Sequence, residues 1–354
     1  MSRFVYTDFD EFADSIRGLD GRYIPTASSE DNWWIDREPI GQLTVQRTQI
    51  GAPVTFAGDG SPDSITVGIP LSDASELRID GQPMSPSGFI VIRRDRPFTY
   101  AAPRKSKWIG LTIPKVLFED PCFADAAQLL DQRLSETRAS TLMPSLRRVS
   151  QLLDLLCGEK TPVHITGPQA RAAAQEQVLL SVAQMLRDSF SDSRTQRFGR
   201  PRVMRDTVLA RCVTVFRENT GQPILVGDLC KQVGVSERTL RNVFHEYFGV
   251  GPVRFLRARQ LHEIRGALLR AQVGQDTVTS VAMRFGVWDF SLFARSYRAM
   301  FGEAPSETLR QSRTATEQPE MDTSFESMQS WMNYASLRFE HRLSAADNAA
   351  FEED

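Results

Sequence analysis

Two stretches of the chain share one pattern: VGDLCKQVGVSERTLRNVF, from Val226 to Phe244, and VTSVAMRFGVWDFSLFARSY, from Val278 to Tyr297. In each stretch a short segment with one apolar face reaches a glycine, Gly234 or Gly286, and a second segment that carries arginines follows. Glycine suits the left-handed conformation in which helices commonly end. The pattern predicts two helix-turn-helix units, and the second helix of such a unit lies in the major groove of DNA.

The second helix of each unit is expected to begin at a capping residue, Ser236 or Asp289, whose side-chain oxygen accepts a backbone hydrogen bond. Arginine can contact guanine, and asparagine adenine, through paired hydrogen bonds worth roughly 1–3 kcal/mol of discrimination. Phe290 lies near the same face, where it either contacts a thymine methyl or packs locally. A solvated polar face is the alternative, but the helix and turn before it favour base contact. The expected outward residues are Arg238, Arg241, Asn242 and His245 in the first unit, and Ser291, Arg295 and Arg298 in the second.

Between the two units, the residues from Val253 to about Leu269 predict a helix, with Leu256 and Leu261 on its inner face. A stiff connecting helix would fix the distance between the units. Both units could then enter successive major grooves on one face of the duplex, about 34 Å apart.

From Val208 to Arg310 the sequence resembles the AraC/XylS family of bacterial transcription regulators. The resemblance implies that Arg238, Arg241 and Asn242, and then Ser291 and Arg295, contact bases. It also implies an activator of transcription, with RNA polymerase as a partner. The sequence departs from the family at Cys230, where alanine is usual, at Trp288, and at Thr308-Leu309-Arg310. The matching positions include Val233-Gly234-Val235-Ser236, Leu240, Phe244, Phe248-Gly249, Pro252, Phe255-Leu256, Arg259, Leu261, Val281-Ala282, Phe285-Gly286, Phe293, Tyr297, Phe301-Gly302 and Ala304-Pro305.

The residues from Pro39 to about Pro114 predict the short strands of a β-sandwich or barrel, because alternating apolar segments are separated by Gly and Pro turns. The run from Leu77 to Ile92 resembles the hairpin of cupin-like barrels. Cupin metal centres rest largely on histidine, and the strand region holds none of the four histidines, so we expect neither metal nor cofactor. The barrel is then a small-molecule receptor or a structural element, and the receptor is favoured. The histidines are His164, His245, His262 and His341.

Large side chains in this region could line a pocket. The simpler interpretation places Trp33, Trp34 and Trp108 in the core and the adjacent Arg93 and Arg94 on a solvated edge. We therefore assign no effector-binding residue from the sequence.

Two helices are predicted after the strands, one with an apolar stripe from Leu146 to Leu156 and one from Gln169 to about Phe190. They either cover the barrel, which is the simpler interpretation, or form a dimer interface. The polar segment from Ser191 to Pro201 predicts a linker. The expected domains are residues 1–195, for effector binding and dimerisation, and residues 206–312, for DNA binding; the resemblance implies the effector and the homodimer.

At 354 residues the chain exceeds the roughly 250–300 residues of one core, which favours two domains. The four cysteines form no CxxC pair and fit reduced thiols. The first residues do not fit a signal peptide, and no apolar run approaches the roughly 18 residues of a membrane span. We expect a cytoplasmic bacterial protein without membrane association.

The net charge of −2 conceals an asymmetry. Residues 196–313 hold 19 basic and 10 acidic residues, whereas residues 314–354 hold 2 basic and 9 acidic ones. The basic charge therefore coincides with the predicted helix-turn-helix units, as DNA binding requires. The tail, residues 313–354, is acidic, but its apolar residues recur at helical spacing and predict a helix. This helix either docks on the protein's own surface or covers the basic domain and weakens DNA binding. These apolar residues are Phe325, Met328, Trp331, Met332, Ala335 and Phe339.

The sequence thus predicts an α+β multidomain protein: an N-terminal cupin-like β-barrel or sandwich with flanking helices, and a C-terminal all-α domain with two helix-turn-helix units. The predicted function is sequence-specific binding of double-stranded DNA under control of a small molecule. One alternative is an architectural DNA-binding protein with a structural barrel. Another is a cupin-type enzyme joined to a DNA-binding domain, but no GxSxG, P-loop or GxGxxG motif is present, and no enzyme is expected.

Overall fold

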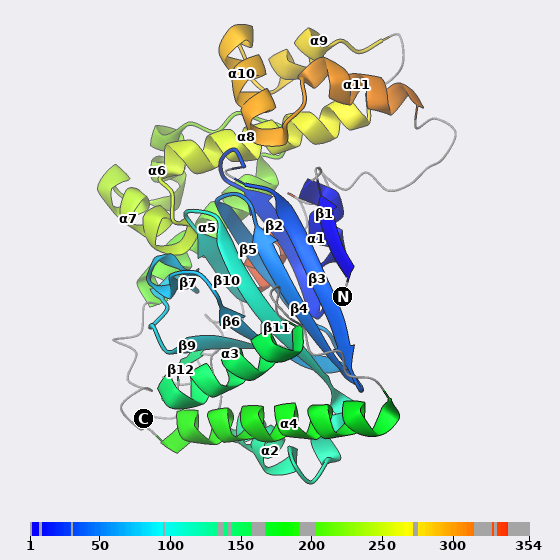
Figure 1. Cartoon of the computed structure of the whole chain (residues 1–354). Helices are drawn as coiled ribbons and strands as arrows, with labels where there is room; N and C mark the ends of the chain where they lie inside the picture. Colours follow the sequence, from blue (N-terminus) through cyan, green and yellow to red (C-terminus); the bar gives the residue numbers. More distant parts are fainter. Residues whose placement is uncertain are drawn as a thin grey trace, which may run out of the picture.

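The computed structural model describes residues 2–6, 9–29, 31–94, 96–133, 138–140, 143–157, 167–191, 203–271, 275–314, 328 and 331–338. A body of antiparallel strands with flanking helices comes first along the chain, and an all-helical part follows it (Figure 1). The predicted α+β architecture with two domains is confirmed. The predicted linker from Ser191 to Pro201 lies almost wholly outside the described residues.

The strands are β1 (Ser2–Tyr6), β2 (Leu19–Pro25), β3 (Trp33–Ile40), β4 (Leu43–Ile50), β5 (Val54–Gly60), β6 (Ser64–Pro70), β7 (Arg78–Ile79), β8 (Gln82–Pro83), β9 (Gly88–Ile92), β10 (Phe98–Ala102), β11 (Ser106–Pro114) and β12 (Arg138–Ser140). The helices are α1 (Phe9–Ser15), α2 (Ala124–Arg133), α3 (Met143–Cys157), α4 (Pro168–Ser191), α5 (Val203–Glu218), α6 (Val226–Val233), α7 (Glu237–Phe248), α8 (Pro252–Leu269), α9 (Val278–Arg284), α10 (Phe290–Phe301) and α11 (Pro305–Thr314). Short 3-10 turns, η1 (Ala74–Glu76) and η2 (Lys115–Glu119), complete the described elements. Within the described ranges, no helix has both the length and the apolar character needed to cross a bilayer.

The described strands form two antiparallel sheets that face each other. Sheet A has the order β1-β3-β4-β11-β6-β9-β12, and sheet B has the order β2-β5-β10-β7-β8. Along β11, Ile109 and Leu111 pack into a core with the helices, whereas Trp108 packs into a second core with Phe56 and Tyr100 of sheet B. This alternation follows from the two-residue period of a strand. Sheet A therefore lies between a layer of helices and sheet B.

Helices α2, α3 and α4 cover the outer face of sheet A (Figure 1). The predicted apolar stripe of α3 is buried there, and so is the predicted inner face of α4. These helices thus cover the barrel, which was the simpler of the two interpretations. A homodimer interface on them stays a prediction.

The all-helical part contains two cores joined by α8. Phe255 and Leu256, near the start of α8, pack with α5, α6 and α7, whereas Ile264 and Leu268, near its end, pack with α9, α10 and α11. One continuous helix thus belongs to the cores of both helix-turn-helix units. It holds the two units together as the sequence predicted.

The tail segment 331–338 is helical and lies between sheet B and the first helix-turn-helix unit; it is drawn in red behind the strands in Figure 1. Met328, Trp331, Met332 and Ala335 share one core with Ile24 and Ala57 of sheet B and with the helices α5 to α8. The predicted amphipathic helix therefore docks on the protein's own surface. Phe325 and Phe339, which belonged to the same prediction, lie outside the described residues.

The strand region begins earlier than predicted, because β1, β2 and much of β3 precede Pro39. Strand β3 was only partly predicted because its charged residues interrupt the alternation of apolar and polar residues. Asp36 is 1% exposed, and Arg3 of β1 donates two hydrogen bonds to its carboxylate, at 2.9 and 2.7 Å. An ion pair between neighbouring strands therefore takes the place of apolar contacts.

Three further predictions about burial have mixed outcomes. The tryptophans Trp33, Trp34 and Trp108 are buried, as expected. Arg93 is buried instead of solvated, because its guanidinium donates to the carbonyl of Leu130 at 2.9 Å. The four-residue spacing of Leu225, Leu229 and Val233 predicts that Leu225 faces inward, but Leu225 is 67% exposed because it precedes the first turn of α6.

Candidate nucleic-acid interface

The first helix-turn-helix unit consists of α6 and α7, with a tight turn between them. Gly234 ends α6 at φ 76°, a left-handed conformation that glycine adopts without strain. The Ser236 hydroxyl then accepts a hydrogen bond from the backbone N–H of Thr239 at 3.2 Å, and so caps α7. Leu229 and Val233 of α6 are buried in the core that also holds the inner face of α7. Both predicted turn residues therefore have the geometry that was expected of them.

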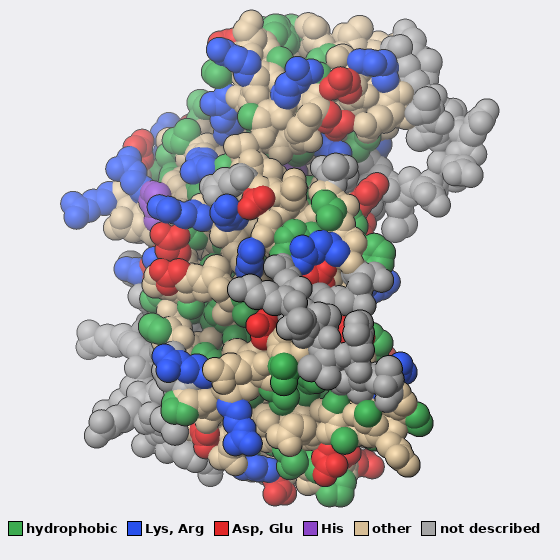
Figure 2. Space-filling view, viewed as in Figure 1, with side chains coloured by type: hydrophobic (Ala, Val, Ile, Leu, Met, Phe, Trp, Pro, Cys, Tyr) green, Lys and Arg blue, Asp and Glu red, His purple; other side chains and the backbone are tan. Residues whose placement is uncertain are grey.

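The outer face of α7 carries the predicted DNA-contacting residues. Arg238, Arg241, Asn242 and His245 are all exposed, whereas the opposite face of the helix is buried. Figure 2 shows Lys and Arg side chains gathered over α7 and continuing over the helices α8 to α10. The structure thus leaves the predicted face of α7 open, in a region where many basic side chains gather.

The second unit consists of α9 and α10. Thr277 caps α9 in a reciprocal hydrogen-bond pair with Ser280, and Gly286 follows the helix at φ 77°. The Asp289 carboxylate accepts from the backbone N–H of Leu292 at 2.9 Å and caps α10. Phe293 and Tyr297 anchor α10 in its core. The predicted turn and cap are again present.

The outer face of α10 carries Ser291, Arg295 and Arg298, all exposed as predicted. Arg298 lies 3.7 Å from Glu307 of α11, with both side chains largely exposed. An exposed ion pair of this kind contributes little to stability and leaves the arginine available for a phosphate. The two units therefore present comparable but chemically different surfaces.

The recognition helices α7 and α10 can be compared position by position, because each spans 12 residues between its capping residue and a left-handed glycine, Gly249 or Gly302. In this alignment Arg238 corresponds to Ser291, Asn242 to Arg295 and His245 to Arg298. The turn of the second unit is longer, and the additional residue brings in Trp288.

Helix α8 sets the distance between the two units. It spans 18 residues, which corresponds to about 27 Å at the usual rise of an α-helix. Arg259 and Glu263 form an ion pair at 2.7 Å inside the protein, and Arg259 also donates to the carbonyls of Phe216 and Asn219 at the end of α5. These bonds fix α8 on the first unit. Arg259 is one of the positions at which the sequence resembles the AraC/XylS family. Its carbonyl partners could not be predicted from the local sequence pattern.

Strand β2 connects the strand body with α8. The imidazole Nε2 of His262 lies 3.1 Å from the carbonyl oxygen of Pro25, and Arg254 donates to the carbonyl of Thr26 at 3.3 Å. Burial lowers the pKa of His262 to about 4, so its imidazole is neutral near pH 7 and can donate to Pro25. Two side chains of α8 thus hold the end of one strand, which no sequence motif indicated.

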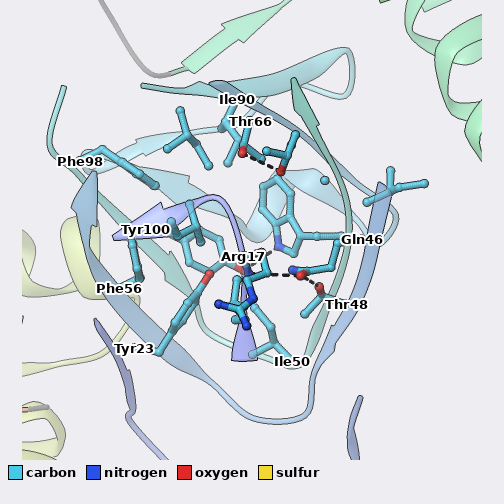
Figure 3. A pocket seen from close by; sticks show the side chains of 18 residues that line it. Arg17, Tyr23, Gln46, Thr48, Ile50, Phe56, Thr66, Ile90, Phe98 and Tyr100 are labelled. Atoms are coloured by element: carbon cyan, nitrogen blue, oxygen red, sulfur yellow. Dashed lines mark hydrogen bonds between the residues drawn. The ribbon is translucent and has the colours of Figure 1, made fainter. Parts of the chain in front are cut away.

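A cavity opens between the two sheets (Figure 3). The cavity and the open solvent at its mouth together hold about 610 Å³ of empty space. Its walls are mainly apolar and aromatic. The side chains named in Figure 3 are Arg17, Tyr23, Gln46, Thr48, Ile50, Phe56, Thr66, Ile90, Phe98 and Tyr100.

Most polar groups of the cavity wall already have partners in the protein. Gln46 accepts from the backbone N–H of Arg17 and donates to Thr48, and the Tyr100 hydroxyl accepts from the indole N–H of Trp108 at 3.0 Å. Burial raises the pKa of both phenols, that of Tyr100 to about 12, so both hydroxyls stay protonated at neutral pH. Among the described residues we find no hydrogen-bond partner for the hydroxyl of Tyr23.

The cavity residues were not predicted, except that Trp108 was considered as a possible lining residue. Trp108 lines the cavity from sheet A. In the part of the chain that the structure describes, no three His, Cys, Asp or Glu side chains are arranged to hold a metal ion.

Comparison with known proteins bears on the helical part of the chain. Residues 229–311 match a family described as "Helix-turn-helix domain". The chain is 35% identical over 101 residues to the XylDLEGF operon transcriptional activator of Pseudomonas putida. The aligned residues make up 28% of this chain and 32% of that protein. The chain is 34% identical over 103 residues to the probable thc operon regulatory protein of Rhodococcus erythropolis, covering 29% and 31% of the two chains.

A solved structure of a probable AraC family transcriptional regulator from Rhodopseudomonas palustris is 31% identical, with a TM-score of 0.27, and covers 30% of this chain and 96% of that one. The chain spans about a third of the length of the two curated relatives. The matched residues coincide with the two helix-turn-helix units described above. The C-terminal domain of the chain is therefore a helix-turn-helix domain of the AraC/XylS type.

Proposed function

We propose that the protein is a sequence-specific DNA-binding regulator of transcription, controlled by a small molecule that binds between the sheets. The observation that carries the first part is the pair of capped recognition helices, each with an exposed polar face, held on the single helix α8. A length of about 27 Å for α8 is comparable to the roughly 34 Å between successive major grooves. The two helices can therefore contact one face of the same duplex.

Within α7, Arg238, Arg241 and Asn242 are proposed to contact bases, and His245 to lie beside them. Within α10, Ser291, Arg295 and Arg298 take the corresponding role. Guanidinium and amide groups suit guanine and adenine edges in the major groove. The net positive charge of residues 196–313 supplies the attraction to phosphates on which all such binding depends.

Replacing Arg241 with alanine tests this assignment. We expect binding of the preferred duplex to weaken by roughly 1–3 kcal/mol, with loss of discrimination at one base position, because a base contact acts on one position only. Fluorescence anisotropy with a set of single-base variants of the duplex measures both quantities.

The matched control is Arg147→Ala, since Arg147 is an exposed arginine on α3, far from the recognition helices along the chain. It should leave affinity and specificity unchanged. If Arg241→Ala instead weakens binding to all sequences equally, Arg241 contacts a phosphate and the specific assignment is wrong.

The second part of the proposal is control by a small molecule, and it rests on sheet B. One face of this sheet lines the cavity, through Tyr23, Phe56 and Tyr100, whereas its other face packs on the DNA-binding helices through Ile24 and Ala57. A ligand that moves β2 would also move the carbonyls of Pro25 and Thr26, which bind His262 and Arg254 of α8. Two adjacent residues of one strand, Tyr23 and Ile24, thus link the cavity to the core of the first unit.

The Tyr23 hydroxyl is the proposed polar anchor for this ligand. Its side chain lies in the cavity wall beside Phe56 and Tyr100, at ring distances of 4.6 and 6.5 Å. A protonated phenol without a protein partner favours a ligand that is mostly apolar and brings a hydrogen-bond acceptor.

Filling the cavity tests the ligand site. A side chain at Gly110 would meet its first neighbour, the Thr66 methyl, at 3.7 Å, which is ordinary contact. We expect Gly110→Val to fold and to bind DNA like the original protein, because valine suits a strand. Its branched carbons enter the cavity, so compounds that raise the melting temperature of the original protein should no longer do so. An unchanged thermal shift with the same compounds would place their site elsewhere.

The proposal extends to activation of transcription with RNA polymerase as a partner. It is supported by the printed function of the Pseudomonas putida relative, an operon transcriptional activator. A homodimer and a cytoplasmic location are part of the same proposal.

A further inference from the structure

The amino-terminal end of α10 is unusual for a surface that is proposed to face DNA, because it is apolar. Trp288 is 78% exposed, Leu292 is 42% exposed and Phe290 is 37% exposed. Apolar side chains exposed together on a surface commonly mark an interaction site. Here they lie at the end of the recognition helix, next to the residues proposed to contact bases.

Comparison with α7 shows that this character belongs to the second unit alone. The positions of Phe290, Leu292 and Ala294 correspond to Glu237, Thr239 and Arg241 of the first unit. Polar or charged residues of α7 are thus replaced by apolar ones at three exposed positions of α10. Trp288 has no counterpart, because the first turn is shorter.

The geometry places these side chains beside the polar strip of α10. Successive residues of a helix are about 100° apart, so Leu292 and Ala294 lie on either side of the strip that Ser291 and Arg295 form. The Asp289 cap fixes the first turn, and Phe293 and Tyr297 hold the opposite face in the core. Leu292 and Ala294 therefore flank the polar strip on a rigid surface, and Phe290 lies one turn before Ala294 on the same side of the strip.

The two helices of this unit also carry exposed arginines. Arg284 of α9, Arg295 and Arg298 all lie in the second unit, and positive charge around an apolar centre is complementary to a DNA groove lined by phosphates. The apolar group that the major groove offers is the methyl of thymine. The apolar side chains lie at the start of a recognition helix, and positive charge lies near them. Both facts favour DNA as the partner of this surface.

We infer that Phe290 and Leu292, with Trp288 beside them, determine specificity by contacting thymine methyl groups in the major groove. The inference rests on the proposed function and assigns a base type to the second unit. The first unit recognises base edges through hydrogen bonds, whereas the second adds apolar contacts to those of Arg295.

Deoxyuridine provides the direct test, because it lacks only the methyl group of thymine. The full chain is used to enrich a duplex from a random pool, and the thymines in the half-site of the second unit are then replaced by deoxyuridine. Burial of one methyl-sized group corresponds to about 0.8 kcal/mol, so each contacted thymine should account for a roughly fourfold loss of affinity.

The variants Phe290→Ala and Leu292→Ala should bind the thymine and deoxyuridine duplexes equally well. Their affinity should fall without a change in the slope of affinity against salt, because apolar contacts release no counterions, whereas Arg298→Ala, which removes an arginine available for a phosphate, should reduce that slope. Val116→Ala, at an apolar residue that is 69% exposed on the strand body, is the matched control and should change nothing.

The inference is overturned if deoxyuridine has no effect, or if the enriched half-site holds no thymine. It is also overturned if the alanine variants bind DNA like the original chain, which would indicate a protein partner for this surface. These results differ from a failure of the proposed function, in which no duplex would be enriched and Arg241→Ala would have no specific effect.

Discussion

Replacing Trp331 with alanine is expected to lower the free energy of unfolding by about 3–5 kcal/mol, the usual cost of truncating a large buried aromatic residue. Trp331 has no exposed surface, and its ring lies 5.6 Å from those of both Phe248 and Phe255. Phe248 is the last residue of α7, and Phe255 lies in the first turn of α8. Loss of the indole would therefore leave a cavity at the base of the first helix-turn-helix unit.

Chemical denaturation followed by circular dichroism measures this change without relying on tryptophan fluorescence. Trp331→Phe is the control, because it keeps most of the ring volume and removes an indole N–H for which we find no partner among the described residues. It should cost far less than the alanine variant. A loss below about 1 kcal/mol for Trp331→Ala would show that the tail helix does not contribute to the core.

Replacing Arg338 with methionine is the second large expected effect, again about 3–5 kcal/mol, because it leaves a buried charge without its partner. Arg338 donates two hydrogen bonds to Asp80, at 2.9 and 2.7 Å, and both side chains are nearly buried. Asp80 belongs to the turn between β7 and β8 of sheet B. The pair therefore joins the end of the tail helix to the strand body.

A double-mutant cycle separates this interaction from the loss of packing. Asp80→Asn removes the charge and still suits the φ of 52° at this position, since asparagine tolerates the left-handed region. Combined with Arg338→Met, it should recover part of the stability that Arg338→Met alone loses. Strict additivity of the two substitutions would contradict a direct interaction.

Together these contacts define the structural role of the tail. Tyr334 donates to Asp20 of β2, and Arg217 of α5 donates to Ser336 at 3.3 Å. The tail helix thus binds both domains at once. Arg238 and Arg241 remain exposed in its presence, so its described part does not cover the recognition face of α7.

The helix-turn-helix units could be predicted from the sequence because every determinant is local. Gly234 and Ser236 act on backbone groups within a few residues, and the apolar face of α7 repeats at helical spacing. The same holds for the second unit. For this reason the exposure of all seven proposed contact residues agrees with the prediction, whereas their contact with bases awaits experiment.

The cavity and the links between the domains could not be predicted, because their determinants are far apart in the sequence. Asp80 and Arg338 are 258 positions apart, and Pro25 and His262 are 237 positions apart. Arg93 was expected on a solvated edge because nothing near it in the sequence indicates a hydrogen-bond partner. Its partner is the carbonyl of Leu130 in α2, 37 positions further along the chain. Such pairs depend on the tertiary fold and leave no periodic signal.

The central claim is that two unequal helix-turn-helix units, held on one helix, bind one duplex. It is tested most directly by enriching duplexes from a random pool with the full chain and sequencing them. We predict two conserved blocks with centres about 10–10.5 base pairs apart, with guanine or adenine in the block of the first unit and thymine in that of the second. A single block, or equal affinity for all sequences, would contradict the account.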